Sequence, residues 1–85
     1  MALEIKIVGT AARYLKNLDK PTRKRIKDKL LQIAEDPNDL RLSYPLTSSD
    51  KRSARVGSYR VLFKVDPDAI VVVHIAPRGQ VYRKA

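Results

Sequence analysis

Two arginines, Arg55 and Arg60, flank a Gly57-Ser58 pair, and their spacing decides which side chains meet across a hairpin. Gly-Ser between two alternating apolar runs is typical of a two-residue β-turn. Counting outward from that turn places Arg55 directly opposite Arg60 on one face of the hairpin. Like charges in this position destabilise a sheet. The pair therefore predicts a binding site for an anionic partner.

The same register places Lys51 opposite Lys64, on the face that carries the two arginines. The other face is apolar and suited to packing against helices, with Arg52 near its edge: Ala54, Val56, Tyr59, Val61 and Phe63. Acids are scarce in residues 50–85 and lie near strand ends or turns: Asp50, Asp66 and Asp68. Two stacked basic pairs with few carboxylates nearby fit a chain of phosphates, as in RNA. A bulge at Gly57 would shift the pairing by one residue and scatter the basic face.

The residues after the last apolar run combine an aromatic ring with cations: Arg78, Tyr82, Arg83 and Lys84. A tyrosine beside arginines can stack on an unpaired base while the guanidinium groups hold phosphates. The alternative is a surface tyrosine that closes the edge of the core. Tyr14 and Tyr59 are assigned to packing.

A second basic run lies in the helical part of the chain: Lys20, Arg23, Lys24, Arg25, Lys27 and Lys29. These side chains occupy most of the helix circumference outside its apolar stripe, as on an ordinary solvated helix. Auxiliary phosphate contact is the alternative.

The single histidine, His74, lies within an apolar run and on strict alternation shares a face with Ile70 and Val72. This pattern predicts a buried, hydrogen-bonded imidazole in preference to a catalytic base. The sequence has no Cys, no second His, no G-x-S-x-G motif and no phosphate-binding glycine loop. Metal chemistry, catalytic triads and nucleotide hydrolysis therefore lack support, and we expect no metal and no cofactor.

Length and composition favour one domain spanning residues 1–85. The 85 residues are 44% hydrophobic, which is enough for one core, and contain no Cys for disulfides or a thiolate zinc site. The net charge of +9 costs stability through self-repulsion, so it favours a polyanionic partner over a surface that is basic by chance. No apolar stretch approaches the roughly 20 residues that cross a bilayer, and the N-terminus lacks a signal-peptide pattern. We expect a cytoplasmic protein that does not contact the membrane.

The N-terminal half predicts a strand followed by two helices. Residues 2–8 alternate as a strand, and Thr10 is expected to cap a first helix that runs to about Leu18. Asp19 followed by Pro21 marks the start of a second helix, which continues at helical spacing to the Asp36-Pro37 stop. The two helices should form a hairpin whose apolar stripes face the sheet.

A loop of residues 36–49 is followed by three predicted strands, at residues 50–56, 59–65 and 69–76. The last of them, AIVVVHIA, is almost continuously apolar, which is typical of a central strand covered on both faces. The element order is β-α-α-β-β-β. It predicts an α+β fold with a helix hairpin packed on one face of a largely antiparallel four-stranded sheet.

The strings SARVGSYRVLFKVD and IVVVHIAPRGQVYR resemble the C-terminal half of the RelE/ParE toxin superfamily, in particular its RelE-like branch. The specific part is R-V-G-x-Y-R followed by an apolar strand and R-x-x-V-Y. With the preceding strand and helix hairpin in the same order, the resemblance covers nearly the whole chain. It implies the toxin of a type II toxin–antitoxin system: a ribosome-dependent endoribonuclease that cleaves mRNA in the A site. The implied reaction is attack of a 2′-hydroxyl on the adjacent phosphate, which inhibits translation.

The resemblance also implies roles for single residues, with Arg60 holding the scissile phosphate. Together with the charge pattern it predicts a catalytic set of Arg60, Arg78, Tyr82 and Lys51, and RNA contacts by Arg55, Arg52, Lys64 and Arg83. Ser53 stands where the best-known members place a lysine proposed as general base. Another group must then accept the proton: Lys51, Tyr82 or His74.

The implied partners are a RelB-like cognate antitoxin, the ribosome and mRNA. The antitoxin should carry an acidic or amphipathic segment that covers the basic face. Two alternatives stay open, because fold does not settle function within this superfamily. One is a ParE-like inhibitor of DNA gyrase, and the other is a non-catalytic RNA-binding module.

Overall fold

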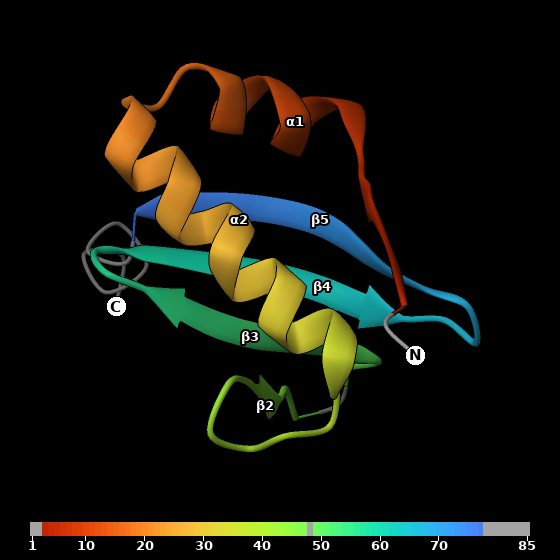
Figure 1. Cartoon of the computed structure of the whole chain (residues 1–85). Helices are drawn as coiled ribbons and strands as arrows, with labels where there is room; N and C mark the ends of the chain where they lie inside the picture. Colours follow the sequence, from red (N-terminus) through yellow and green to blue (C-terminus); the bar gives the residue numbers. More distant parts are fainter. Residues whose placement is uncertain (1–2, 48, 78–85) are drawn as a thin grey trace.

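The computed structural model describes residues 3–47 and 49–77, which form a five-stranded sheet with two helices beside it (Figure 1). In chain order the elements are β1 (Glu4–Ile7), α1 (Gly9–Lys16), α2 (Lys20–Glu35), β2 (Tyr44–Pro45), β3 (Lys51–Val56), β4 (Tyr59–Val65) and β5 (Ala69–Pro77). The strand order is β1-β5-β4-β3-β2, with β1 parallel to β5 and the other pairs antiparallel. The predicted α+β fold is confirmed. The short strand β2 adds a fifth strand within the segment predicted as a loop.

Both helices cover the same face of the sheet, and the hydrophobic core lies between the two layers (Figure 1). The buried stripe of α2 recurs at helical spacing: Ile26, Leu30, Ile33 and Ala34. It packs against sheet residues such as Phe63 of β4, whose side chain is fully buried. Tyr14 of α1 meets Tyr59 of β4 edge to face with ring centroids 6.4 Å apart, which confirms the packing role predicted for both. No helix in the described part of the chain is long and apolar enough to cross a membrane.

The start of α2 follows its local sequence signal. Asp19 is the N-cap, and its Oδ2 accepts a hydrogen bond from the backbone N–H of Thr22 at 3.2 Å. This bond stabilises the charged carboxylate and therefore lowers the pKa of Asp19. Pro21 lies within the first turn, where its missing N–H leaves no helix hydrogen bond unmade.

The bounds of α1 differ from the prediction, because its N-cap is Val8 instead of Thr10 and it ends at Lys16 instead of Leu18. Val8 donates its N–H to the backbone oxygen of Val72 in β5 at 3.0 Å, so the sheet ladder extends to this residue. Its own carbonyl then accepts the first helical bond, from the N–H of Ala12 at 2.8 Å. The pairing of β1 with β5 thus fixes where the helix begins.

β3 and β4 pair in the register that the Gly57-Ser58 turn predicts. The six pairs run from Val56 with Tyr59 beside the turn to Lys51 with Lys64 at the far end. Gly57 has a φ of +58°, a left-handed conformation that glycine adopts without the steric penalty of a Cβ. The turn is therefore made at Gly57, and the pairing of β3 with β4 continues without a shift.

β5 contains an irregularity that the alternation pattern does not predict. Leu62 of β4 pairs with His74 and Phe63 pairs with Val72, so the ladder skips one residue of β5. An extra residue of this kind moves the following side chains to the opposite faces of the sheet. Consistent with this, the buried positions Val72 and Ile75 lie three residues apart instead of two. His74 is exposed as a result, and the prediction of a buried imidazole is wrong.

β5 lies between β1 and β4, as predicted for a central strand. The helices cover only one of its faces, however (Figure 1). On the other face Val71 is only partly buried. Within the described part of the chain, the prediction that this strand is covered on both faces is therefore wrong.

Candidate nucleic-acid interface

We call the sheet face that points away from the helices the open face. Strand register arranges its side chains in three rows: Arg55, Arg60 and Ala76; Tyr44, Ser53, Leu62 and His74; and Lys51, Lys64, Val71 and Lys6. Along β3 and β4 neighbouring rows are two residues apart, which corresponds to about 7 Å, whereas in β5 the skipped residue places His74 and Val71 three residues apart. A central row of mostly uncharged side chains thus lies between two rows that carry cations.

The structure brings the four predicted cations of the β3–β4 hairpin onto this one face. Arg55 is exposed, whereas Arg60, Lys51 and Lys64 are half-buried. Lys6 of β1 lies on the same face, and its Nζ is 3.9 Å from the carboxylate of Glu4. Glu4 is the only acidic residue in the four described strands β1, β3, β4 and β5. The open face therefore carries far more positive than negative charge, as its sequence pattern predicts.

Lys51 differs from the two arginines because it has an acid beside it in sequence. Its Nζ lies 3.6 Å from an oxygen of Asp50, the residue before β3. Both side chains are at least partly exposed, so this ion pair is weak and can open when a stronger anion approaches.

Arg52 lies on the opposite face from Arg55, because adjacent residues of a strand alternate. Its guanidinium is part-buried and donates to Ser43, from Nε to the side-chain oxygen at 3.0 Å and from Nη2 to the backbone oxygen at 3.2 Å. These bonds attach the chain before β2 to β3. The structure therefore separates Arg52 from the other predicted RNA contacts.

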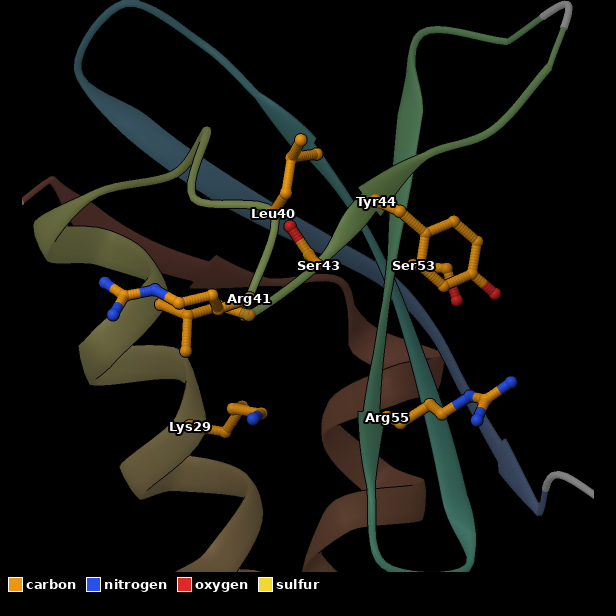
Figure 2. A pocket seen from close by; sticks show the side chains of 8 residues that line it. Lys29, Leu40, Arg41, Ser43, Tyr44, Ser53 and Arg55 are labelled. Carbon is orange, nitrogen blue, oxygen red and sulfur yellow. The ribbon is translucent and has the colours of Figure 1, made fainter.

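A hollow of about 320 Å³ lies beside β3 (Figure 2) and is lined by Lys29, Leu40, Arg41, Leu42, Ser43, Tyr44, Ser53 and Arg55. In Figure 2 the Tyr44 ring and the Arg55 guanidinium extend to the same side of β3. Lys29 and Arg41 lie on the other side of that strand, toward α2. Tyr44 is 39% exposed, so an aromatic surface is available at the edge of the open face.

A second hollow, of about 300 Å³, lies further along β3 and also borders Arg55 and Lys29. It includes Arg25, so two cations of the basic helix run lie near Arg55. Other members of that run interact within the helical layer. Arg23 donates to the backbone oxygen of Lys16 at 3.2 Å, and Lys24 forms an ion pair with Asp28 at 3.2 Å.

The segment that leads into β2 is held by Asp39. Its carboxylate accepts three hydrogen bonds from Arg41: from the backbone N–H at 2.9 Å, from Nε at 3.1 Å and from Nη2 at 2.8 Å. These bonds and the adjacent positive charge lower the pKa of Asp39 from 3.8 to about 2. The same interaction raises the pKa of Arg41. The pair orders the loop that places Tyr44 beside β3.

Ser53 is fully buried in the central row, between its cross-strand neighbours Tyr44 and Leu62. Its hydroxyl finds no hydrogen-bond partner among the described residues. A buried hydroxyl at this position does not reach solvent and cannot replace the lysine that the resemblance led us to expect there.

Three predicted site residues, Arg78, Tyr82 and Arg83, lie outside the described residues. The described chain ends at Pro77, which is paired with Tyr59. The preceding residue, Ala76, is paired with Arg60, so the last described residues run beside the row that carries the arginines.

Sequence reasoning missed Tyr44 and misplaced His74. Tyr44 belongs to a strand of only two residues, too short to produce an alternation signal. The extra residue, Val73, is the last of three consecutive valines, so the sequence gives no signal that the faces change there. No cluster of His, Cys, Asp or Glu in the described part of the chain could hold a metal ion.

Comparison with known proteins identifies the family to which this chain belongs. The sequence profile described as "ParE toxin of type II toxin-antitoxin system, parDE" matches residues 5–82. The chain belongs to the ParE/RelE toxin superfamily. It is therefore a toxin of the type II toxin–antitoxin class. A search of curated protein sequences found no significant match.

Solved toxin structures share the fold of this toxin. The RelBE2 toxin–antitoxin complex from Mycobacterium tuberculosis matches with a TM-score of 0.79 and 24% identity, over 92% of this chain and 93% of the other. The RelE–RelB complex from Pyrococcus horikoshii matches with a TM-score of 0.77 and 24% identity, over 94% of this chain and 99% of the other. A mutant of Escherichia coli RelE in the free state matches with a TM-score of 0.79 and 21% identity, over 100% of this chain and 95% of the other. At these identities the likeness establishes the RelE-like fold.

Proposed function

We propose that this toxin is a ribosome-dependent endoribonuclease that cleaves mRNA in the A site and so inhibits translation. The observation that carries the proposal is the directly opposed pair Arg55 and Arg60 on the open face of the sheet. Opposed like charges destabilise the free protein, and a phosphate group placed between them removes that repulsion. The R-V-G-x-Y-R motif that supplies this pair is also the most specific part of the RelE-like resemblance.

In the proposed reaction a 2′-hydroxyl attacks the adjacent phosphate, leaving a 2′,3′-cyclic phosphate and a 5′-hydroxyl. Arg60 holds the scissile phosphate and stabilises the charge that develops on its oxygens. Lys51 contributes positive charge from the other cationic row. Arg78 and Tyr82 complete the proposed catalytic set on the strength of the resemblance.

The proposed RNA contacts outside the catalytic set are Arg55, Lys64 and Arg83. Arg52 is left out because its guanidinium is bonded to Ser43 on the helix side of the sheet. Lys29 and Arg25 lie close enough to Arg55 to lengthen the path of a bound strand around the edge of β3.

Substitution of Arg60 tests the proposal. We expect Arg60→Ala to abolish growth arrest when the toxin is expressed without antitoxin, and to lower mRNA cleavage on purified ribosomes by about 100-fold or more. The physical reason is the loss of the cation that stabilises the reacting phosphate. Cleavage is measured by mapping mRNA 5′ ends at codon resolution.

The matched control is Arg13→Ala, which removes the same charge from the exposed surface of α1 on the helix side. This variant should arrest growth as the wild type does. Thermal unfolding followed by circular dichroism establishes that both variants are folded. A folded Arg60→Ala protein that is fully toxic would contradict the catalytic assignment.

Inhibition of DNA gyrase is the second candidate, because the matching family description names ParE. Transcript mapping separates the two activities. Cleavage within codons after induction supports the ribonuclease. Intact transcripts together with double-strand DNA breaks would support gyrase inhibition instead.

The proposed partners are a cognate RelB-like antitoxin, the ribosome and mRNA, in the cytoplasm. The Mycobacterium tuberculosis and Pyrococcus horikoshii relatives were crystallised as complexes with RelB antitoxins. An acidic antitoxin segment complements the cations of the open face and would block access of RNA to them.

A further inference from the structure

We propose that His74 is a catalytic residue of the open face and accepts the proton of the attacking 2′-hydroxyl. The inference deepens the proposed ribonuclease function and rests on it. It supplies the proton acceptor that Ser53 cannot be, since the Ser53 hydroxyl is buried at 0% exposure.

The position of His74 follows from the irregularity in β5. Without the skipped residue, alternation would turn the imidazole toward the helices with Val72. With it, His74 pairs with Leu62 of β4 and is exposed on the open face. Bulges next to active sites commonly re-aim one side chain in this way. Here the re-aimed side chain is the only histidine in the sequence.

The neighbours of His74 are the cations proposed to bind RNA. Its cross-strand partner Leu62 lies between Arg60 and Lys64 along β4, so these two residues occupy the diagonal positions. Diagonal neighbours in antiparallel strands lie about 7–8 Å apart, which long side chains and a bound phosphate can span.

The other charged groups that face this region from the described elements lie on β1. Lys6 pairs with Val71, and the skipped residue of β5 lies between Val71 and His74. The Nζ of Lys6 forms an ion pair with the Glu4 carboxylate at 3.9 Å. The imidazole makes no hydrogen bond or ion pair with any described residue. Both ring nitrogens are therefore available to a ligand that lies across the central row.

Tyr82, which the resemblance also offers as a proton acceptor, lies outside the described residues. Among the described residues of the open face, the other groups that could accept the proton are less suitable. Lys51 is a cation paired with Asp50 at 3.6 Å, and it would have to lose its proton before accepting another. Tyr44 lies at the opposite end of the central row, two strands away from Arg60. A neutral imidazole, by contrast, has a free lone pair on one ring nitrogen and can accept a proton directly.

The step balances without a further reagent. A ring nitrogen of His74 takes the proton of the 2′-hydroxyl as the oxygen bonds to phosphorus. The bond from phosphorus to the 5′-oxygen then breaks, and that oxygen takes a proton from solvent water. The imidazolium returns its proton to solvent before the next turnover. The role of His74 is thus that of a general base.

The test is single-turnover cleavage of mRNA on purified, mRNA-programmed ribosomes, measured from pH 5 to pH 9. We expect His74→Gln to lower the rate about 100-fold or more while ribosome affinity and thermal unfolding stay unchanged. The fall in wild-type rate toward acid pH should be absent in the variant. In His74→Ala, added imidazole should restore part of the rate, since it supplies the missing base.

Each alternative outcome is decisive. If His74→Gln cleaves at the wild-type rate while Arg60→Ala is inactive, the histidine assignment is overturned and the ribonuclease proposal stands. Loss of activity that retains the wild-type pH profile and shows no imidazole rescue would also overturn it, because a purely structural role has that signature. If the wild type itself does not cleave mRNA, the ribonuclease proposal fails.

Discussion

At the scale of single residues, neighbouring arginines of one strand have different surroundings. Arg52 and Arg55 both lie on β3, yet one donates two hydrogen bonds to Ser43 and the other extends from the open face beside Tyr44 (Figure 2). The difference arises from strand alternation, which sends odd and even positions to opposite faces. The two residues carry the same charge, so what distinguishes them is the face of the sheet on which each side chain lies.

This difference predicts opposite effects of two alanine substitutions. Arg55→Ala should weaken RNA binding and reduce the slope of log affinity against log salt by about 0.7, the value for one lost phosphate contact on a single strand. Its thermal stability should not fall, because the substitution removes repulsion with Arg60.

Arg52→Ala should instead leave the salt slope of RNA binding unchanged and lower the free energy of unfolding by about 2 kcal/mol, since two part-buried bonds to Ser43 are lost. Fluorescence anisotropy with labelled RNA and urea denaturation measure the two quantities. Equal effects of the two substitutions on either quantity would contradict this division of roles.

At the scale of elements, the open face depends on how its borders are fixed. The loop before β2 is fastened by Asp39 and Arg41 and then by the bonds from Arg52 to Ser43. These contacts place Tyr44 beside Ser53 although β2 itself has only two residues. A very short strand can therefore be positioned by side-chain bonds on the loop that precedes it.

The loop predicts a specific pH dependence. The pKa of Asp39 is lowered from 3.8 to about 2 by its bonds with Arg41, so the charged form is favoured by folding. The Asp39 carboxylate therefore stabilises the folded protein fully above about pH 4, and this stabilisation is lost as the pH falls through about 2. Arg41→Gln should raise the midpoint toward 3.8 in an NMR titration of the Asp39 carboxyl carbon.

The control for this titration is Arg13→Gln, which removes a charge from α1 and should leave the Asp39 midpoint where it is in the wild type. An Asp39 midpoint near 3.8 in the wild-type protein would show that the bonds with Arg41 do not hold in solution.

At the scale of the whole molecule, positive charge lies on both layers. The chain carries 18 Lys and Arg against 9 Asp and Glu, and α2 contributes many of the cations on the side away from the open face. Such an excess repels itself in the compact state, so the toxin should be most stable when an anionic partner or salt screens it.

Salt should therefore act in opposite directions on stability and on binding. Raising sodium chloride from 20 to 500 mM should increase the melting temperature of the free toxin, because repulsion is screened, while RNA affinity falls. Four phosphate contacts by the hairpin cations give a slope of log affinity against log salt of about −3. A melting temperature that falls with salt, or an affinity that does not respond to it, would contradict the proposed role of the charge.

Local sequence was sufficient to predict the register of the hairpin and the start of α2. Both depend on short-range chemistry: the turn at Gly57-Ser58 sets which residues of β3 and β4 meet, and the Asp19 carboxylate satisfies a free N–H three residues away. The opposition of Arg55 and Arg60, on which the candidate site depends, therefore follows from the amino-acid order of the hairpin.

Long-range contacts determine how β1, β2 and β5 complete that site. The parallel pairing of β1 with β5 joins segments more than 60 residues apart, and β2 is held by side-chain bonds that leave no periodic pattern. The skipped residue in β5 arises where Leu62 and Phe63 take up His74 and Val72 as partners, which a uniformly apolar run does not reveal. Because that pairing joins separate strands, only the assembled sheet places His74 diagonally beside Arg60.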